Sequence, residues 1–509
     1  MLSSPSIESS HSSHPAHTLG SDLCSLLRQG VQLYPDKTAV LYQGAEYSYF
    51  TLALATHHLQ RQFAAQGITR GTMVGITLPS SPVFLATVFA LAALGACVLP
   101  LSPSRPPQQR AQLANKYRIQ KLLVNHASQA LEGLHVLVLA DLNIDAEEAQ
   151  RFQQSAPAQP DASLADAPWF VALSSGTSES PKGVALTQAQ SLIRVEQSLL
   201  TWDANTRTIP FDLSMGAGIF PALRTLAHGG TLLFIENADF DNDFASYVNR
   251  HQATHILLSP WMAAKLIQQL HGRKLAMPSL QYLWLGGGHC SSEVLQGLLD
   301  RATLNVWVKY ASVETGVIAG VHAKDALLNP GLSGKLGPWV QARVQDVDGS
   351  VLAEGQSGLL SFRSAGWPSR YAVDEDNAAG AFSGGWYCSE DIGRLGADRS
   401  IYVEGRAGGA LNFGGIRIQP EFVEEALAKQ LNILDCAATE QRQADGNVHL
   451  IIAICAADSA KQAQILALLD QLLPSSQRIV KQVAVVAQIL RTGMGKVARQ
   501  QMRVLLEKA

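Results

Sequence analysis

Short apolar runs alternate along the chain with longer stretches in which apolar and polar positions recur with a helical period. The strand-like runs are rich in aliphatic residues and lie at positions 73–78, 121–124, 231–235, 256–258 and 282–285. Among the intervening stretches, residues 49–63 and 107–116 predict helices. Strands that alternate with helices in this way form parallel sheets covered by helices. The pattern therefore predicts an α/β fold.

The pattern changes twice in the second half of the chain. Residues 334–402 hold short strand-like runs separated by turn residues, which predict a small distorted barrel beside the parallel-rich sheets. A glycine-rich bend follows at residues 405–409, and the roughly one hundred residues beyond it are enough for a separate α+β domain. We predict a disordered tail over residues 1–20, an N-terminal domain over 21–404 and a C-terminal domain over 405–509.

Composition and charge argue against a membrane protein, a secreted protein and a nucleic-acid-binding protein. Residues 83–101 form a long apolar run, but Gly95 and Pro100 interrupt it, so we expect a buried helix followed by a strand and no membrane insertion. The start of the chain lacks the features of a signal peptide, and six scattered cysteines without zinc spacing suit free thiols in a reducing compartment. The net charge of −3 gives no reason to expect nucleic acid as a partner. We expect a cytoplasmic protein.

A polar loop directly follows a buried strand at residues 169–173. The loop, Ser174–Gly183, is crowded with hydroxyl groups and glycine, and Lys182 adds a compact positive charge. Backbone N–H groups and hydroxyls in such a loop are suited to surrounding a polyphosphate. It is not the common P-loop, because Pro181 and Gly183 stand where that motif has glycine and a hydroxyl residue. An ordinary surface loop is the alternative.

Four further stretches carry side chains suited to nucleotide chemistry. Within residues 310–314, Tyr310 is suited to stacking on a purine and Glu314 to holding magnesium on phosphates. Asp391 is suited to accepting hydrogen bonds from two ribose hydroxyls. Residues 405–421 combine a glycine-rich bend with basic residues, and residues 491–499 present Lys496 on a glycine-flexed loop. For each stretch alone, a strand-end loop, a solvated acid or a surface lysine remains an open interpretation.

In order and spacing, these five stretches resemble the adenylate-forming ligases: acyl-CoA and aryl-CoA synthetases, luciferases and the adenylation domains of peptide synthetases. The resemblance extends from about Thr38 to Arg499 and includes residues 91–103. This family activates a carboxylic acid with ATP. The carboxylate attacks the α-phosphorus, pyrophosphate leaves, and a thiol then takes the acyl group from the acyl-adenylate.

The resemblance implies roles for individual residues. Catalysis would rest on Lys182, on Glu314 as the magnesium ligand, and on Lys496, which would bridge the attacking carboxylate and the α-phosphate. ATP would contact Ser174, Ser175, Gly176, Thr177, Ser178, Lys182, Gly287, Gly288, Tyr310, Ala311, Ser312, Asp391 and Arg406. The C-terminal domain would be a mobile lid, with its hinge at Gly408 and a loop on the thiol side at Gly414 and Gly415. The implied cofactors are ATP and Mg²⁺, with CoA or phosphopantetheine as acyl acceptor.

Some positions depart from the family pattern: Glu179, Ala311, Val313, Glu390, Gly408 and Asn412. Glu179 would bring an acid close to the phosphates, Val313 removes a hydroxyl, and Glu390 replaces a glycine before the ribose-binding acid. The charged set, however, is retained in full: Lys182, Glu314, Asp391, Arg406 and Lys496. We therefore expect a divergent but active ligase.

The acid substrate is less clearly indicated. Phe211-Asp212-Leu213-Ser214 looks like the element of amino-acid-activating members in which the aspartate pairs with the substrate α-amino group. Asp212 is equally suited to capping the following helix. Lys309 falls at the wall of the family's acyl pocket, where it would pair with Asp212 or with a second acidic group on the substrate, or point to solvent. The positions that the resemblance assigns to the acid are Asp212, Gly216, Trp284, Gly286, Lys309 and Val317.

Three functions remain open from the sequence. The first is a free-standing ligase of secondary metabolism that loads an amino acid or related acid on a separate carrier protein. The second is an acyl-CoA or aryl-CoA synthetase. The third is a degenerate nucleotide-binding protein, suggested by Glu179 and Val313. Pyrophosphate release with some acid would distinguish the first two from the third.

Overall fold

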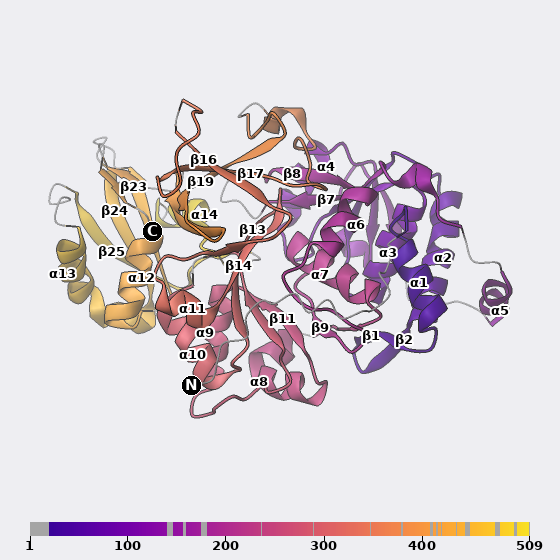
Figure 1. The fold of residues 1–509 in the computed structure, drawn as a ribbon, viewed down its shortest axis with the longest axis horizontal. Coiled ribbons are helices and arrows are strands. Elements are labelled where there is room, and N and C mark those ends of the chain that lie inside the picture. Colours follow the sequence, from indigo (N-terminus) through magenta and orange to yellow (C-terminus); the bar gives the residue numbers. More distant parts are fainter. Residues whose placement is uncertain are drawn as a thin grey trace.

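The structure is a computed structural model of the whole chain (Figure 1). It describes residues 20–139, 146–155, 159–174, 181–235, 237–288, 290–346, 348–377, 380–407, 411–413, 416–418, 420–433, 435–442, 448–473, 479–492 and 496–507. The predicted tail, except Gly20, lies outside these residues. In Figure 1, the helices between residues 25 and 154 occupy one side of the molecule, the longest sheet runs through the middle, and the C-terminal elements lie on the other side.

The first sheet is built from early strands and is largely parallel. Among the described residues its order is β6 (His135–Val138), β5 (Lys121–Val124), β3 (Met73–Thr77), β4 (Cys97–Pro100), β7 (Pro168–Leu173) and β8 (Gly183–Thr187). Only the last pair, β7 and β8, is antiparallel. Its central strands are almost fully buried, as expected for parallel strands with helices on both faces.

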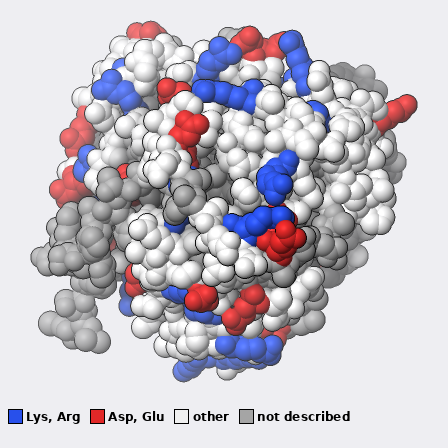
Figure 2. Space-filling model, turned by 90° about the vertical axis from the view of Figure 1, so that its right-hand side faces the viewer, with Lys and Arg blue, Asp and Glu red and all other residues white. Residues whose placement is uncertain are grey.

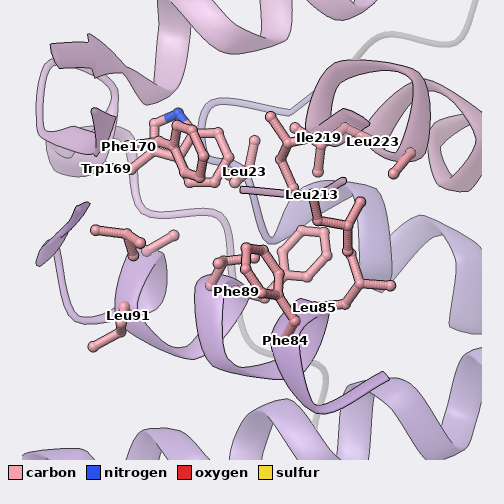
Figure 3. Packing of buried hydrophobic residues seen from close by; sticks show 14 of the residues in the cluster. Leu23, Phe84, Leu85, Phe89, Leu91, Trp169, Phe170, Leu213, Ile219 and Leu223 are labelled. Atoms are coloured by element: carbon pink, nitrogen blue, oxygen red, sulfur yellow. The ribbon is translucent and has the colours of Figure 1, made fainter. Parts of the chain in front are cut away.

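Helices of the N-terminal half lie around this sheet and between it and the second sheet. They are α1 (Ser25–Leu33), α2 (Tyr49–Ala65), α3 (Pro82–Ala93), α4 (Pro107–Lys116), α5 (Ala146–Gln154), α6 (Gln188–Glu196) and α7 (Gly216–Ala227). Helix α3 starts where the Ser81 hydroxyl accepts the Phe84 N–H, with Pro82 in the first turn. It is apolar on all sides and therefore becomes a core helix. Figure 3 shows Phe84 and Phe89 of α3 in the same core as Trp169 of β7 and Ile219 of α7.

The second sheet is longer and mixed. Among the described residues its order is β16 (Gln341–Gln345), β17 (Gly358–Arg363), β19 (Trp386–Leu395), β20 (Ser400–Arg406), β15 (Gly334–Leu336), β14 (Gly316–His322), β13 (Val306–Ser312), β12 (Tyr282–Leu285), β11 (His255–Leu258), β9 (Arg207–Ile209), β10 (Thr231–Leu233), β1 (Thr38–Tyr42) and β2 (Ala45–Ser48), with β18 (Phe382–Ser383) paired to β19. The run from β13 to β1 is parallel, and the strands from β14 to β16 are antiparallel. The antiparallel end is the region in which the sequence predicts a small barrel.

Four helices accompany the parallel part of this sheet: α8 (Asn237–Arg250), α9 (Pro260–Gln269), α10 (Ser292–Arg301) and α11 (Ala323–Leu328). Their apolar residues form a second core with the buried strands β11 to β13. The strands predicted at residues 231–235, 256–258 and 282–285 are thus confirmed as β10, β11 and β12. Strand β13 continues to Ser312, so Tyr310 belongs to a strand, and the strand-end loop left open for residues 310–314 begins only after Ser312.

The C-terminal region has its own core. It contains the hairpin β21 (Leu411–Phe413) and β22 (Ile416–Ile418), and a sheet of β23 (Cys436–Arg442), β24 (Val448–Cys455) and β25 (Lys481–Val486). Its helices are α12 (Pro420–Leu431), α13 (Gln462–Leu472) and α14 (Arg499–Glu507). The α/β class, with a large sheet-rich N-terminal part and a smaller C-terminal part, is therefore confirmed. Strand β20 ends at Arg406, so the predicted boundary at residues 404/405 falls within that strand.

Surface charge, helix length and cysteine pairing can be described for the residues that the structure places. Figure 2 shows Lys and Arg interspersed with Asp and Glu over a largely uncharged face. No described helix has the length and apolar character needed to cross a bilayer. The six cysteines are unpaired, and Cys97, Cys290 and Cys436 are buried.

Candidate active site

The predicted phosphate loop connects the antiparallel strands β7 and β8. At its base, the Ser174 N–H donates to the Lys182 carbonyl at 2.7 Å, and the Lys182 N–H donates to Ser174 Oγ at 3.1 Å. Gly183 is required by packing, because a Cβ there would lie 2.4 Å from Tyr117 Oη. The loop is therefore anchored at both ends. Its middle lies outside the described residues, including Ser175, Gly176, Thr177, Ser178 and Glu179.

Lys182 and Glu314 meet through an aromatic residue that the sequence did not single out. The Lys182 ammonium lies 5.2 Å from the ring centroid of Tyr371, and the Tyr371 hydroxyl donates to Glu314 Oε1 at 3.0 Å. Burial, followed by the charge of Glu314, raises the pKa of Tyr371 and keeps it a hydrogen-bond donor. Tyr371 lies in an irregular segment, where no periodicity could mark it. The contact joins the end of the phosphate loop to the predicted magnesium ligand.

A buried arginine fixes the turn that carries Glu314. Arg194 of α6 donates to the Val313 carbonyl at 3.1 Å and to the Glu314 carbonyl. Burial lowers the pKa of Arg194 to about 9, and the nearby Glu314 charge acts in the opposite direction. Val313, one of the departures from the family pattern, packs against the hydrophobic core. Its lost hydroxyl is thus replaced by apolar contact.

The Glu314 side chain fits a magnesium site. It is only 7% exposed, and Oε2 accepts no hydrogen bond from the described residues. No group of three or more acidic, His or Cys side chains lies near enough together in the described part of the chain to hold a metal. Mg²⁺ is often held by one or two carboxylates together with substrate phosphates and water. Glu314 would supply the protein carboxylate, and the remaining ligands would come from the nucleotide and water.

Tyr310 of β13, Asp391 of β19 and Arg406 of β20 lie close together. The Tyr310 hydroxyl donates to Asp391 Oδ2 at 2.5 Å, and Asp391 lies directly opposite Arg406 across β19 and β20, with 3.7 Å between Oδ1 and Nε. Glu390 also reaches Arg406, at 3.4 Å. Although burial lowers the pKa of Arg406, Asp391 and Glu390 together raise it. The departure at Glu390 thus adds a second acid around the same guanidinium.

The predicted adenine turn follows β12. Gly286 is buried, Gly287 has a φ of +89° that favours glycine, and Gly288 is exposed next to Pro260. On the adjacent strand, a bulge separates Tyr310 from Ala311. Ser312 closes the following turn through a 3.0 Å contact between its Oγ and Thr315 Oγ1.

Lys496 is presented by a loop of the C-terminal region. The Thr492 N–H donates to the Lys496 carbonyl at 2.7 Å, and Arg491 pairs with Val497. The Lys496 side chain is exposed, yet the surrounding protein lowers its pKa, and the Arg406 charge lowers it further. Asp391 and Glu421 act in the opposite direction. Lys496 therefore lies within electrostatic reach of Asp391 and Arg406. Three related glycines lie outside the described residues: Gly408, Gly414 and Gly415.

The positions assigned to the acid divide into two groups. Asp212 accepts the Ser214 N–H at 2.9 Å and the Ser102 hydroxyl at 3.2 Å, close to Arg105. It therefore orders the loop before α7, whose cap position is Met215 and whose first residue is Gly216. Trp284, Gly286, Lys309 and Val317 lie instead on or beside β12 to β14. No hydrogen bond or ion pair between described residues joins Asp212 to Lys309.

The chain is similar to known proteins over almost its whole length. A family model described as AMP-binding enzyme matches residues 27–372. The indoleacetate–CoA ligase of Aromatoleum aromaticum is 24% identical over 505 residues, which cover 94% of this chain and 96% of the relative. The nonribosomal peptide synthetase sidE of Aspergillus fumigatus is 25% identical over 94% of this chain, which spans only 23% of that synthetase.

The fold is shared with solved structures. The o-succinylbenzoate coenzyme A synthetase of Bacillus subtilis, solved with ATP and a magnesium ion, has a TM-score of 0.79 and 19% identity. The match covers 94% of this chain and 98% of that one. The matched family region contains the phosphate loop, Glu314 and Tyr371, and the fold match extends into the C-terminal region. The chain therefore belongs to the AMP-binding enzymes of the adenylate-forming superfamily and is an ATP-dependent ligase.

Proposed function

We propose that the protein activates a carboxylic acid through an acyl-adenylate and transfers the acyl group to a thiol. In the first half-reaction, a carboxylate oxygen bonds to the α-phosphorus of ATP as the bond from that phosphorus to pyrophosphate breaks. In the second, the thiol sulfur bonds to the acyl carbon, its proton is released, and AMP leaves. Both steps depend on positioning and on balancing charge near phosphate.

The observation that carries this proposal is the position of Lys496. Its exposed ammonium group lies within electrostatic reach of Arg406 and Asp391, although Lys496 belongs to the C-terminal region, where its neighbour Val497 packs in a core with Met502. A cation in this position would neutralise the approaching carboxylate and the α-phosphate together. Because Lys496 is held only by its loop, it can be withdrawn before the thiol arrives.

The remaining charged residues would hold the nucleotide. Lys182 would contact the β- and γ-phosphates, and Asp391 would accept the ribose hydroxyls beside Arg406. Glu314 would hold Mg²⁺, which when bound neutralises and orients phosphate oxygens. Tyr371 and Arg194 act as positioning residues, since they fix the carboxylate and the backbone of Glu314.

The contacts of Asp212 favour an acid without an α-amino group. A carboxylate that pairs with a substrate ammonium needs free oxygen lone pairs directed at the substrate. Asp212 instead accepts an N–H and a hydroxyl from its own chain and lies close to Arg105. We infer that amino-acid activation, which the Phe-Asp-x-Ser element suggests, is not the reaction of this chain.

For the acyl acceptor, we favour CoA over a carrier protein. The similarity to indoleacetate–CoA ligase spans nearly all of both chains, whereas the similarity to the peptide synthetase covers under a quarter of it. Phosphopantetheine on a separate carrier protein presents the same thiol and remains the second candidate.

Pyrophosphate release over a panel of acids tests the proposal. The panel should contain fatty, aryl, dicarboxylic and amino acids, and each active acid should then be offered CoA or a phosphopantetheinylated carrier protein. We expect release with at least one acid that lacks an amino group, acyl-AMP in the mass spectrum, and thioester formation with CoA. Release with no acid would overturn the proposal, and activity confined to amino acids would overturn the choice of acid.

A further inference from the structure

Lys309 lies in the middle of the long sheet, immediately before Tyr310. Its stem runs along Gly286 of the adjacent strand end, where a Cβ would lie 2.9 Å from Lys309 Cε and 3.0 Å from its Cγ. Its cross-strand partner on β14 is Gly320, where a Cβ would meet Leu199 and Trp284. Gly286 thus leaves the space that the lysine stem occupies, whereas Gly320 leaves space for Leu199 and Trp284.

Among the residues that the structure describes, no acidic group balances this lysine. Lys309 is partly buried and makes no hydrogen bond or ion pair with the described residues. Within the described part of the chain, the charged group that acts on it is Arg224, which is also a cation and is buried. Burial, and then Arg224, lower the pKa of Lys309 to about 8. Near neutral pH this part of the protein therefore holds excess positive charge.

The Arg224 guanidinium already has hydrogen-bond acceptors within the protein. Its N–H groups donate to the carbonyls of Val195, Arg194 and Gln197 at 2.6–3.0 Å. Arg224 also stacks over Trp202, with 5.4 Å from Cζ to the ring centroid. It is thus fixed in place and contributes a constant positive potential beside Lys309.

A second donor without an acceptor lies on the same face of the sheet. Trp284 is 6% exposed, and its Nε1 has no hydrogen-bond partner in the described part of the chain. Trp284 precedes Gly286 by two residues, so both face the same side of the sheet as Lys309. Buried donors nearly always have partners in native proteins. An unmatched ammonium and an unmatched indole N–H together indicate that an acceptor is missing here.

The location fits the far end of the acid substrate. Successive side chains of a strand point to opposite faces, so Lys309 lies across β13 from Tyr310 and its bond to Asp391. In the proposed function, the reacting carboxylate of the acid meets the nucleotide at the Tyr310–Glu314 end of this strand. The rest of a short acid would then extend along the face that holds Lys309 and Trp284.

We propose, on the basis of that function, that Lys309 pairs with a second anionic group of the substrate, and that the enzyme activates a dicarboxylic acid or a carboxylic acid bearing a sulfonate. The Trp284 indole N–H donates to the same anionic group. The phosphate-side residues bind the reacting carboxylate, whereas Lys309 selects the acid by the charge at its other end.

Matched substrates test this assignment directly. Pyrophosphate release should be measured with diacids, with their monomethyl esters and with monoacids of the same carbon skeleton, using the wild type, Lys309→Met, Lys309→Arg and Lys324→Met. Lys324 is an exposed lysine of α11, so Lys324→Met matches the charge change away from the site. Binding of a non-hydrolysable ATP analogue should be measured in parallel.

The wild type should prefer a diacid over its monomethyl ester. Lys309→Met should lower the diacid-to-ester ratio of kcat/KM by about 30-fold or more, as expected when one partner of a buried charge pair is removed. Lys309→Arg should keep most of the preference, Lys324→Met all of it, and ATP-analogue affinity should stay constant throughout.

Contrary outcomes are distinguishable. Wild-type preference for monoacids, or an unchanged ratio in Lys309→Met, would overturn the assignment of Lys309, and the wild-type panel alone suffices if that variant does not fold. An equal loss with diacids and esters would also overturn it, because Lys309 would then be a positioning residue. Failure of every acid would instead overturn the proposed function.

Discussion

The two ends of the candidate active site hold their charged groups in opposite ways. At one end, Glu314 is 7% exposed, accepts a hydrogen bond from Tyr371, and stands on a turn whose carbonyls are bonded by Arg194. At the other end, Lys496 is exposed, and its side chain makes no hydrogen bond with the described residues. The first group is held by its neighbours through its side chain and its turn, whereas the second is held through its backbone.

Because of this difference in burial, changes at the two ends should have different effects on folding stability and on catalysis. Burial of a charged group is unfavourable unless its partners compensate, so changes around Glu314 should destabilise the fold as well as impair ATP binding. An exposed lysine on a loop contributes little to folding, so changes at Lys496 should affect the reaction alone. In the proposed function, the fixed end would supply preorganised electrostatics, and the exposed lysine would act in the first half-reaction and be withdrawn before the second.

Lys496→Ala gives the largest expected effect and tests the exposed end. Adenylate formation, measured as pyrophosphate release, should fall by about 100- to 1000-fold, because one preorganised donor to the transition state is lost. Thioester formation from a supplied acyl-adenylate should change by only a few-fold, and the melting temperature should stay the same. An equal loss in both half-reactions, or a marked loss of stability, would contradict the contrast between the two ends.

Arg194→Met tests the buried end. The carbonyls of Val313 and Glu314 would lose their buried donor, which costs roughly 1–3 kcal/mol for each group left unsatisfied. We expect a melting temperature lower by several degrees in calorimetry, together with a raised KM for MgATP. Arg194→Lys should lose less stability because the charge remains. Unchanged stability in Arg194→Met would show that the Glu314 turn needs no such support.

The sequence predicted the charged residues of the candidate site better than the residues that support them. Lys182, Asp391 and Lys496 stand in stretches with an unusual local composition, so each stretch was visible before folding. Arg194 and Tyr371 carry no such signal, because their partners lie 120 and 57 residues away along the chain. An arginine in an amphipathic helix has the pattern of a surface residue, and only tertiary packing buries it.

The fold, too, was predicted where the sequence has a regular apolar pattern and missed where polar residues interrupt it. The parallel strands and their helices were predicted from apolar periodicity, because burial on both faces imposes it. The continuation of β13 to Ser312 was not predicted, since Lys309 and Ser312 interrupt the apolar run. Pairing with β14 across a bulge keeps these polar residues in the strand. Polar residues in the strand therefore marked the site and obscured its secondary structure.

Tyr371→Phe sharpens the comparison at the buried end. It removes the hydroxyl that donates to Glu314 and keeps the ring under Lys182, so the loss should be about 1–2 kcal/mol. We expect a roughly tenfold higher KM for MgATP, partly restored by raising the magnesium concentration. Tyr371→Leu, which also removes the ring, should be worse. If the two variants behaved alike, the hydroxyl would be the relevant group and the contact with Lys182 would be incidental.

Glu390→Gly gives the smallest expected effect, because the ion pair that it removes is open to solvent. Glu390 and Arg406 are 61% and 52% exposed and lie 3.4 Å apart, and such pairs contribute about 0–1 kcal/mol. The KM for ATP should therefore change by no more than about threefold, and the difference should shrink at high salt as the pair is screened. Glu390→Gln, which keeps the size of the side chain and removes its charge, should behave like Glu390→Gly. An improvement of more than about tenfold in Glu390→Gly alone would exceed the worth of an exposed pair and would mean that this side chain crowds the nucleotide. In that case the size of the Glu390 side chain, and not only its screened charge, would limit nucleotide binding beside Arg406.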